Sequence, residues 1–381
     1  MISSALVAAL VGYGASIALV LSAATAVGAS PAQTASWLVA VCFAKAIGTA
    51  LLSTWHKMPM VLAWSTPGAA VIAATSGITF PEAVGAFVVT GVLLALTGAV
   101  RPFGQLIARI PEGIAGGMLA GVLLPFCLQG AGAAQNLPHI VLPMVAVFAL
   151  VRLWNPAMAV LAALTLGLVL AFGLGSAPAP DLALTLPLPI LVLPEFRLPV
   201  LIGLAVPLYL VTMASQNLPG FATMRAAGYE PPAGSALMVT GGLSTLAAFF
   251  GAHPINMAAI TAAICLGDDV HPDRNQRWKV GLAYGAFWMG LGLAGPVVLA
   301  VLAVLPPDVM AALVALALVG PLLGALTVAY AQPAQRFAAT ITLVVTGSGV
   351  VAFGIGAAFW GLAAGLVVFG LERLRRQAGQ T

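Results

Sequence analysis

Long apolar runs separated by short polar connections follow one another along the whole chain. The first run extends from Ala5 to about Val27 without a charged residue. No basic segment precedes it and it is longer than the apolar part of a signal peptide, so we expect it to be retained. A helix needs about 20 apolar residues to cross the hydrocarbon layer of a membrane. The pattern therefore predicts fourteen spans, at residues 5–27, 36–54, 60–76, 81–100, 111–129, 138–153, 156–174, 197–218, 234–251, 252–267, 278–304, 308–327, 333–350 and 354–371.

The composition indicates the same class of protein. Of the 381 residues, 61% are hydrophobic and 6% are charged, and the mean hydropathy is +1.10. A soluble domain carries about 25% charged residues, so we expect an all-α polytopic protein embedded in a lipid bilayer. No cofactor is indicated. The cysteines lie singly in apolar runs and predict neither a disulfide framework nor a metal site; they are Cys42, Cys127 and Cys265.

The basic residues indicate how the chain is oriented. If the N-terminus is cytoplasmic, the inner connections hold twelve Lys and Arg residues and the outer connections hold only Arg197. Lys and Arg accumulate on the cytoplasmic side, so both termini are expected there. The same distribution explains a pI of about 9.2 without a nucleic-acid partner. The inner residues are Lys57, Arg101, Arg109, Arg152, Arg225, Arg274, Arg277, Lys279, Arg336, Arg373, Arg375 and Arg376.

The two halves of the chain resemble each other. Three short matches occur in the same order in both halves, and seven spans per copy is an odd number. The second copy must therefore enter the membrane from the opposite side, which gives a 7+7 inverted repeat, an architecture typical of transporters. The matches pair Ser65–Ala70 with Ala252–Met257, Val84–Phe87 with Tyr284–Phe287, and Pro111-Glu112 with Pro307-Asp308.

Spans three and ten each contain a proline among polar residues. Proline disfavours helical backbone at the residue before it but is tolerated in the first turn of a helix. We expect an extended segment up to Thr66 and a half-helix from Pro67, and an extended Gly-Ala-His followed by a half-helix from Pro254. Two helix N-termini that meet near the midplane favour a carboxylate or a similar oxyanion. The alternative is that both prolines are kinks that only shape packing.

Span eight carries polar side chains next to each other in an otherwise apolar run. Gln216 and Asn217 lie near its inner end, before Pro219-Gly220, where we expect the helix to break. Either these amides face the cavity as neutral donors, or they cap the end of the helix. In the repeat, span eight pairs with span one, where the region around Tyr13 is the counterpart.

Several motifs together resemble the bacterial benzoate:proton symporter family, BenE, over nearly the whole chain. The motifs are Trp64-Ser65-Thr66-Pro67-Gly68, Thr212-Met213-Ala214-Ser215-Gln216-Asn217-Leu218-Pro219-Gly220, Ala226-Ala227-Gly228-Tyr229, Ala259-Ile260-Thr261-Ala262-Ala263-Ile264-Cys265 and His271-Pro272-Asp273-Arg274-Asn275-Gln276-Arg277-Trp278. The family is similar in architecture to nucleobase and sulfate-type anion transporters.

The resemblance implies a core domain of residues 1–100 and 197–304, with spans 1–4 and 8–11, and a gate domain of residues 101–196 and 305–381. It also implies proton-driven uptake of benzoate into the cell across the inner membrane by alternating access, and often a homodimer. Nucleobase relatives carry an acidic residue in span eight, whereas this chain has Gln216 and Asn217. A carboxylate side chain in span eight would repel an anionic substrate. Its replacement by amides therefore fits a substrate that is itself a carboxylate.

The expected substrate site lies between the two half-helices and against span eight. Its residues are Tyr13, Ser65, Thr66, Gly68, Gln216, Asn217, His253, Ile255, Asn256 and Met257. The candidates for binding the proton are His253, Glu112 and Asp268. Histidine titrates near neutral pH, and a bound carboxylate would favour its protonated form. Its alternative role is a neutral side chain that satisfies local backbone groups.

The remaining charged residues have a structural and a functional interpretation each. Glu112 and Asp308 begin helices at matching places, where acidic side chains complement the helix terminus, and Glu82 is expected to do likewise. Asp268 either joins a salt-bridge network at the inner face or relays protons. Lys45 falls within span two, where it either attracts the anion or extends its amino group to the cytoplasmic surface.

Three classes of function remain for comparison. The leading one is proton-coupled symport of benzoate or a similar aromatic carboxylate. The alternatives are a nucleobase or inorganic-anion symporter on the same fold, and a passive anion channel. An ATP-binding domain is not expected, because no GxxxxGK[ST] motif occurs. An enzyme is not expected, because no paired acids or His/Cys cluster fall at the midplane.

Overall fold

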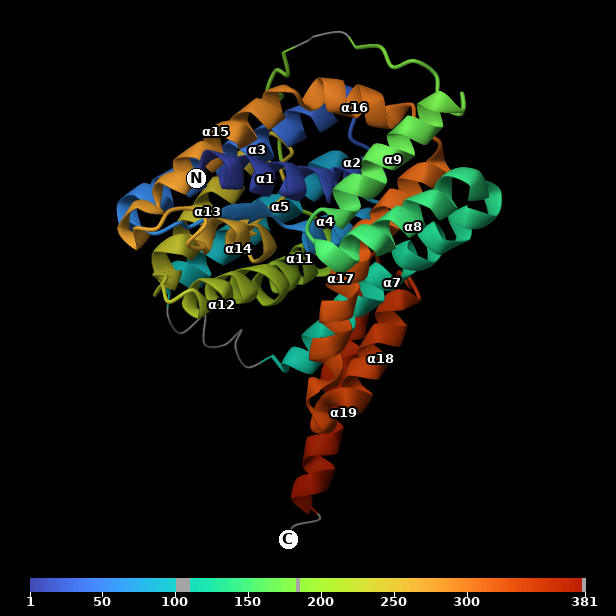
Figure 1. The fold of residues 1–381 in the computed structure, drawn as a ribbon. Helices are drawn as coiled ribbons and strands as arrows, with labels where there is room; N and C mark the ends of the chain where they lie inside the picture. The colour runs from blue at the N-terminus through green and yellow to red at the C-terminus, as the bar shows by residue number, and fades with distance from the viewer. Residues whose placement is uncertain (101–109, 183–185, 379–381) are drawn as a thin grey trace.

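A computed structural model describes residues 1–100, 110–182 and 186–378 (Figure 1). The first half contains α1 (Ile2–Gly14), α2 (Ile17–Ala26), α3 (Pro31–His56), β1 (Leu62–Trp64), α4 (Thr66–Ala73), α5 (Phe80–Ala99), α7 (Glu112–Asn136), α8 (Pro138–Trp154) and α9 (Ala159–Gly173). Arg101 and Arg109, two of the residues used to orient the chain, lie outside the described residues.

The second half follows the same order of elements. It contains α10 (Leu198–Val200), the π-helical turn η1 (Leu201–Ala205), α11 (Val206–Thr212), the π-helical turn η2 (Met213–Asn217), α12 (Leu218–Ala226), α13 (Ala233–Ala248), β2 (Ile255–Met257), α14 (Ile260–Leu266), the 3-10 turn η3 (Arg274–Gln276), α15 (Lys279–Leu293), α16 (Gly295–Ala303), α17 (Pro307–Ala331), the 3-10 turn η4 (Pro333–Gln335), α18 (Arg336–Gly347) and α19 (Ala357–Ala378).

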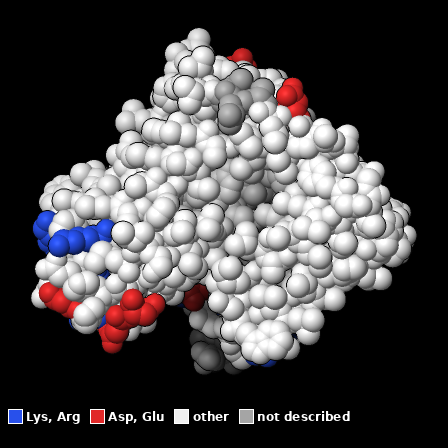
Figure 2. Space-filling model, turned by 45° about the horizontal axis from the view of Figure 1, so that its top comes forward, with Lys and Arg blue, Asp and Glu red and all other residues white. Residues whose placement is uncertain are grey.

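The membrane character of the chain is evident from helix length and composition. Among the described residues, seven helices are long and apolar enough to cross a membrane, or up to eight if the pair of helices that bends by 53° at Ala294 counts as one span. Three further apolar helices, α8, α9 and α13, are shorter. The protein is therefore polytopic and helical, while the exact number of fourteen crossings stays a prediction. Figure 2 agrees, since the face it shows is largely uncharged and its charged side chains gather in a few small groups.

The helices pack in two groups, which are seen on the left and on the right of Figure 1. In the first group α5 packs on α13, α3 packs on α15, and α1 contacts α14 and α15. In the second group α7 packs on α17 and α18, α18 on α19, and α8 on α9. Glycines permit the closest approach: Gly91 of α5 lies against Thr245 of α13, and Gly241 of α13 lies against Ala95 of α5.

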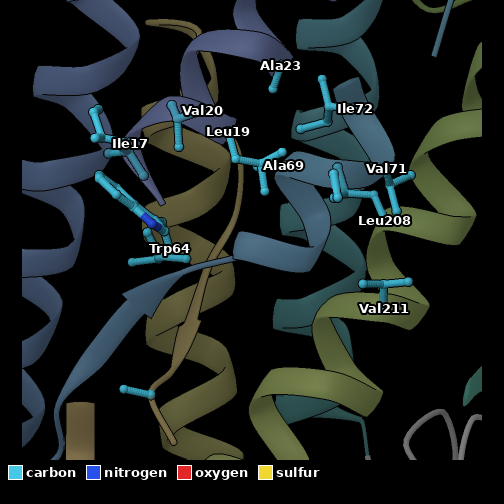
Figure 3. Packing of buried hydrophobic residues seen from close by; sticks show 14 of the residues in the cluster. Ile17, Leu19, Val20, Ala23, Trp64, Ala69, Val71, Ile72, Leu208 and Val211 are labelled. Carbon is cyan, nitrogen blue, oxygen red and sulfur yellow. The ribbon is translucent and has the colours of Figure 1, made fainter. Parts of the chain in front are cut away.

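Helix α4 is embedded in the apolar interior. Its residues Ala69, Val71 and Ile72 are buried between α2, which contributes Leu19, and α11, which contributes Leu208 (Figure 3). Short as it is, α4 is held by this packing in a fixed place, and its first residues are thereby positioned for the site described below.

The structure corrects the expected start of the half-helix in span ten. Pro254 does not begin a helix: the chain continues as strand β2, and α14 starts only at Ile260. The reason is that the Pro254 carbonyl accepts a hydrogen bond of 3.0 Å from the Ser65 N–H, which extends the pairing of β2 with β1. The strands are offset by 193 residues, from Leu62 to Ile255, and not by the 187 that separate Pro67 from Pro254.

The expected break in span eight is also wrong. The helix runs without interruption from Leu198 to Ala226, and Pro219 lies inside it. Proline has no N–H to donate to the carbonyl four residues earlier, and here that carbonyl belongs to Ser215 in the π-helical turn η2. The wider π-helical turn accommodates the missing backbone hydrogen bond, as is common where helices bend. The same arrangement recurs at Pro207, which follows η1.

Candidate functional site

Two segments from opposite halves of the chain form a small antiparallel sheet. Strands β1 and β2 pair Leu62 with Met257, Ala63 with Asn256, and Trp64 with Ile255. All residues of β2 are fully buried. Because unpaired backbone groups are costly away from water, this pairing allows extended backbone to lie inside a bundle of helices. It also brings the start of α4 next to residues 253–257.

The middle of span eight fastens onto this sheet. The Asn217 Oδ1 atom accepts a hydrogen bond of 2.9 Å from the Met257 N–H. The Asn256 Nδ2 group donates to Gln216 Oε1 over 3.3 Å, and the hydroxyls of Ser65 and Thr212 are 2.9 Å apart. Three segments that are far apart in sequence thus meet at one polar cluster, which we call the crossing cluster.

The start of α4 leaves few donors free. The Ser65 hydroxyl accepts from the Gly68 N–H over 3.1 Å, and Pro67 has no N–H. Thr66 is partly exposed, and its N–H has no hydrogen-bond partner among the described residues. A Cβ at Gly68 would lie 2.5 Å from Ser65 Oγ and 2.7 Å from Leu208 Cδ1, so only glycine fits beneath this cap.

Three of the predicted residues have buried polar atoms without a hydrogen-bond partner among the described residues. They are the Tyr13 hydroxyl, the His253 Nε2 atom and the Asn256 Oδ1 atom. Gln216 is partly exposed, and its Nε2 group has no hydrogen-bond partner in the described part of the chain. Buried polar groups are nearly always paired. The unpaired atoms of these described residues are therefore an unusual feature of the region around the crossing cluster.

His253 lies behind the cluster in a wall of aromatic rings. Its Nδ1 atom accepts a hydrogen bond of 2.8 Å from Trp37 Nε1. Its ring is 5.6 Å from that of Trp37 and 6.4 Å from that of Trp64, measured between centroids. Tyr13 lies close by, with its ring 5.6 Å from that of Trp64.

Lys45 does not reach the surface, contrary to one of the two interpretations of its sequence position. The side chain is 1% exposed. Its Nζ atom lies 3.0 Å from the centroid of the Trp288 ring, 5.2 Å from that of Tyr284 and 5.4 Å from that of Trp64. The rings of Trp288, Tyr284 and Trp64 therefore lie around the amino group, and we call these three rings the aromatic cage.

Comparison with known proteins then decides the family. The family model described as benzoate membrane transport protein, BenE, matches residues 1–371. The chain is 32% identical over 363 residues to the benzoate membrane transport protein of Acinetobacter baylyi, covering 95% of this chain and 92% of that protein. The chain belongs to the BenE family. The expected resemblance is therefore confirmed, and the family is one of membrane transporters, not enzymes.

Other similarities agree with this result. The BenE-family chain is 38% identical to the inner membrane protein YdcO of Escherichia coli, over 95% of this chain and 93% of that one. Its fold resembles the transmembrane domain of a cyanobacterial bicarbonate transporter, BicA, with a TM-score of 0.60, 15% identity, and coverage of 95% and 97% of the two chains. It also resembles SLC26A9, with a TM-score of 0.65 and 16% identity, over 98% of this chain and 66% of that one. At these identities the likeness shows the fold alone.

Two predicted proton-binding residues of this BenE-family chain lie outside the crossing cluster. Glu112 is the first residue of α7, and its counterpart Asp308 lies in the first turn of α17, where it accepts from Asn136 Nδ2 over 3.0 Å. Asp268 pairs with Arg277, which also donates to the Leu266 and His271 carbonyls. These places match the expected helix-terminus and ion-pair roles.

Glu82 has the structural role that was expected of it. It forms a capping box with Thr79 at the start of α5 and an ion pair of 3.0 Å with Arg197.

Two cavities open beside the site of this BenE-family chain. The first, of about 400 Å³, lies between the two groups of helices and is lined by residues that include Val71, Thr75, Pro125, Gly203 and Thr346. The second, of about 460 Å³, lies where α12, α14 and Arg277 meet, and Asp268 lines it. None of the ten predicted substrate-binding residues lines either cavity.

Proposed function

We propose that this protein is a secondary active transporter that carries benzoate or a similar aromatic carboxylate into the cell together with protons. The observation that supports it most is the crossing cluster, where β1, β2 and the middle of span eight meet around amide and hydroxyl groups. An anion site made of neutral donors and not of fixed cations allows both binding and release. Membership in the BenE family supports benzoate as the substrate.

Gln216 and Thr66 are the proposed direct ligands of the carboxylate. Both are partly exposed, and the Gln216 Nε2 group and the Thr66 N–H point to no partner among the described residues. The deeper residues hold them: Asn256 orients Gln216 through its hydrogen bond of 3.3 Å, and Ser65 caps α4. Tyr13, His253, Ile255 and Met257 form the apolar and aromatic surroundings that a benzene ring would need.

Alternating access needs two bodies that move against each other. We propose that residues 1–100 and 197–304 form the core domain and residues 101–196 and 305–381 form the gate domain. The packing of α5 on α13 and of α3 on α15 in one group, and of α7 on α17 in the other, supports this division. The cavity between the groups, lined by residues of α4, α7 and α18, is the proposed route by which one side reaches the substrate.

The protein is proposed to lie in the inner membrane with both termini in the cytoplasm, as the distribution of basic residues predicts. A homodimer stays an expectation. Of the three sequence candidates for the proton, His253 is the one that is buried beside the crossing cluster. Glu112 and Asp268 already have partners or roles at helix ends.

Uptake of radiolabelled benzoate into proteoliposomes tests the proposal, with and without an imposed inward proton gradient. Accumulation above equilibrium that collapses with a protonophore would support proton-coupled symport. Saturable uptake that stops at equilibrium would indicate a facilitator or a channel instead. If benzoate is not taken up under either condition, the same assay with nucleobases and inorganic anions would test the alternative substrates.

A further inference from the structure

Lys45 stands apart from every other cation that the structure describes. It lies in the middle of α3, is 1% exposed, and has its Nζ atom over three aromatic rings. Within the described residues there are two ion pairs, Arg197–Glu82 and Arg277–Asp268, and neither includes Lys45. A lysine buried in this way, with no carboxylate beside it, is rare in membrane proteins and marks a functional site by default.

Among the described residues, no carboxylate forms an ion pair with Lys45. On α3 its neighbour is the Cys42 thiol, α14 contributes the Cys265 thiol, and α15 contributes the Tyr284 hydroxyl. Tyr13 of α1 lies against the Trp64 and Trp288 rings of the cage. Helices α13 and α16, which also pack on α3, carry no titratable side chain. Asp269 lies near Cys265, at the C-terminal end of α14, and does not form an ion pair with Lys45.

Two opposing effects act on the amino group. Burial disfavours its charged form, because an ammonium ion loses its hydration. Aromatic faces favour the charged form, because their negative faces attract a cation. The attraction of the aromatic cage compensates for only part of the hydration energy that the ammonium ion loses. Whether the Lys45 amino group is charged therefore depends on whether an anion is close by.

The cage borders the crossing cluster directly. Trp64 forms one wall of the cage and is the residue immediately before the Ser65 cap of α4. The Tyr284 hydroxyl donates a hydrogen bond of 3.1 Å to the Leu62 carbonyl. Tyr284, a second ring of the cage, is therefore bound directly to β1. A carboxylate bound at the start of α4 would therefore lie beside the cage, separated from it by the Trp64 ring.

We propose that Lys45 binds the proton that is transported with the carboxylate. When the substrate site is empty, Lys45 is a neutral amine. Binding of the anion is accompanied by uptake of one proton at Nζ, so that the loaded core domain carries no net charge from this pair. Release of the anion on the other side frees the proton. This inference rests on the proposed function, since it needs an anionic substrate at the crossing cluster.

His253 is the competing residue and its geometry disfavours it. Its Nδ1 atom accepts the Trp37 hydrogen bond of 2.8 Å, so a second proton on the ring would break that bond. Lys45 has no such bond to lose.

The test is the pH dependence of benzoate binding to the purified full-length protein in detergent, measured by calorimetry in buffers of different ionisation enthalpy. If only the protonated form of Lys45 binds, the apparent Kd of the wild-type protein rises about tenfold for each pH unit above the range where Lys45 is already protonated. Benzoate binding at high pH would then be accompanied by uptake of about one proton. In Lys45→Met and in Lys45→Arg, neither of which changes charge in this range, the Kd should not vary with pH and no proton should be taken up.

The matched control is Lys57→Met, because Lys57 also lies over an aromatic ring, with its Nζ 4.0 Å from the Trp278 centroid, but is exposed. It should keep the pH dependence of the wild-type protein. Two lysine variants are used so that a folding defect in one does not decide the result. Proton uptake that persists in a folded Lys45 variant would overturn the inference, as would wild-type binding of benzoate without proton uptake. Absence of benzoate binding to the wild-type protein would instead overturn the proposed substrate, and the inference with it.

Discussion

The Asn217 Oδ1 atom accepts a hydrogen bond of 2.9 Å from the Met257 N–H, and this contact ties span eight to strand β2. Both residues are fully buried. The tie holds the neighbouring Gln216 next to Asn256. The two adjacent amides of span eight therefore have different roles, one structural and one directed outward, and substitutions should separate them.

Replacing Asn217 by Ala should mainly lower stability. The Met257 N–H would be left unpaired in the interior, which costs about 1–3 kcal/mol. We expect a lower apparent melting temperature in detergent, measured by fluorescence-detected size exclusion. Asn217→Asp keeps an acceptor in place and should retain the fold but weaken benzoate binding by repulsion. An unchanged melting temperature in Asn217→Ala would show that this hydrogen bond does not hold span eight.

Replacing Gln216 by Ala should leave the melting temperature close to that of the wild-type protein, because the side chain is partly exposed. Benzoate binding should weaken by roughly tenfold or more, as expected for loss of one hydrogen bond to a charged ligand. Gln129→Ala is the control, since Gln129 is exposed on α7. Equal affinity in the Gln216 variant and the control would remove span eight from the substrate site.

Neighbouring glycines of α13 should respond very differently to Ala. A Cβ at Gly241 would overlap the backbone of Ala95 in α5, whereas a Cβ at Gly242 would meet nothing within 4 Å. We expect Gly241→Ala to lower the melting temperature and the yield of folded protein, because overpacking between helices typically costs about 1–3 kcal/mol. Gly242→Ala should leave both unchanged. The same response from both variants would contradict the close packing of α5 on α13.

Asp268→Asn should have little effect on transport or on its pH dependence. The Asp268 side chain is 93% exposed, and exposed ion pairs contribute little to stability. Arg277→Ala should do more, because Arg277 is buried and also holds the Leu266 and His271 carbonyls. Benzoate uptake driven by a proton gradient is the measurement for both. A flattened pH profile in Asp268→Asn would restore this carboxylate as a proton-binding residue.

Local sequence rules predict the start of α4 but not the start of α14. Pro67 lies in the first turn of α4 as its chemistry favours, and Ser65 caps the helix. Pro254 has the same chemistry, but its carbonyl accepts a hydrogen bond from the Ser65 N–H. The segment that follows Pro254 therefore pairs as a strand and does not form a helix. That hydrogen bond joins residues far apart in sequence, and no pattern around Pro254 contains it.

The Lys45 cage is invisible in sequence for the same reason. Its rings come from positions 64, 284 and 288, which only the packing of α3 against α15 and β1 brings together. A lysine inside an apolar run indicates a functional residue. The sequence does not indicate whether its side chain extends to the surface or stays within the bundle. The polar pair Gln216 and Asn217 was easier to find, because two amides in a membrane span need partners wherever they lie.

The last prediction separates His253 from Lys45 as the proton-binding residue. His253→Gln keeps an acceptor that can receive the Trp37 hydrogen bond, and His253 is fully buried. If His253 is a neutral acceptor, the variant should bind benzoate with the pH dependence of the wild-type protein, while Lys45→Met loses that dependence. His253→Phe, which cannot accept this hydrogen bond, should lower the melting temperature. The measurement is the apparent Kd for benzoate over a range of pH in both His253 variants. A Kd that no longer varies with pH in a folded His253→Gln protein would assign the proton to His253 and not to Lys45.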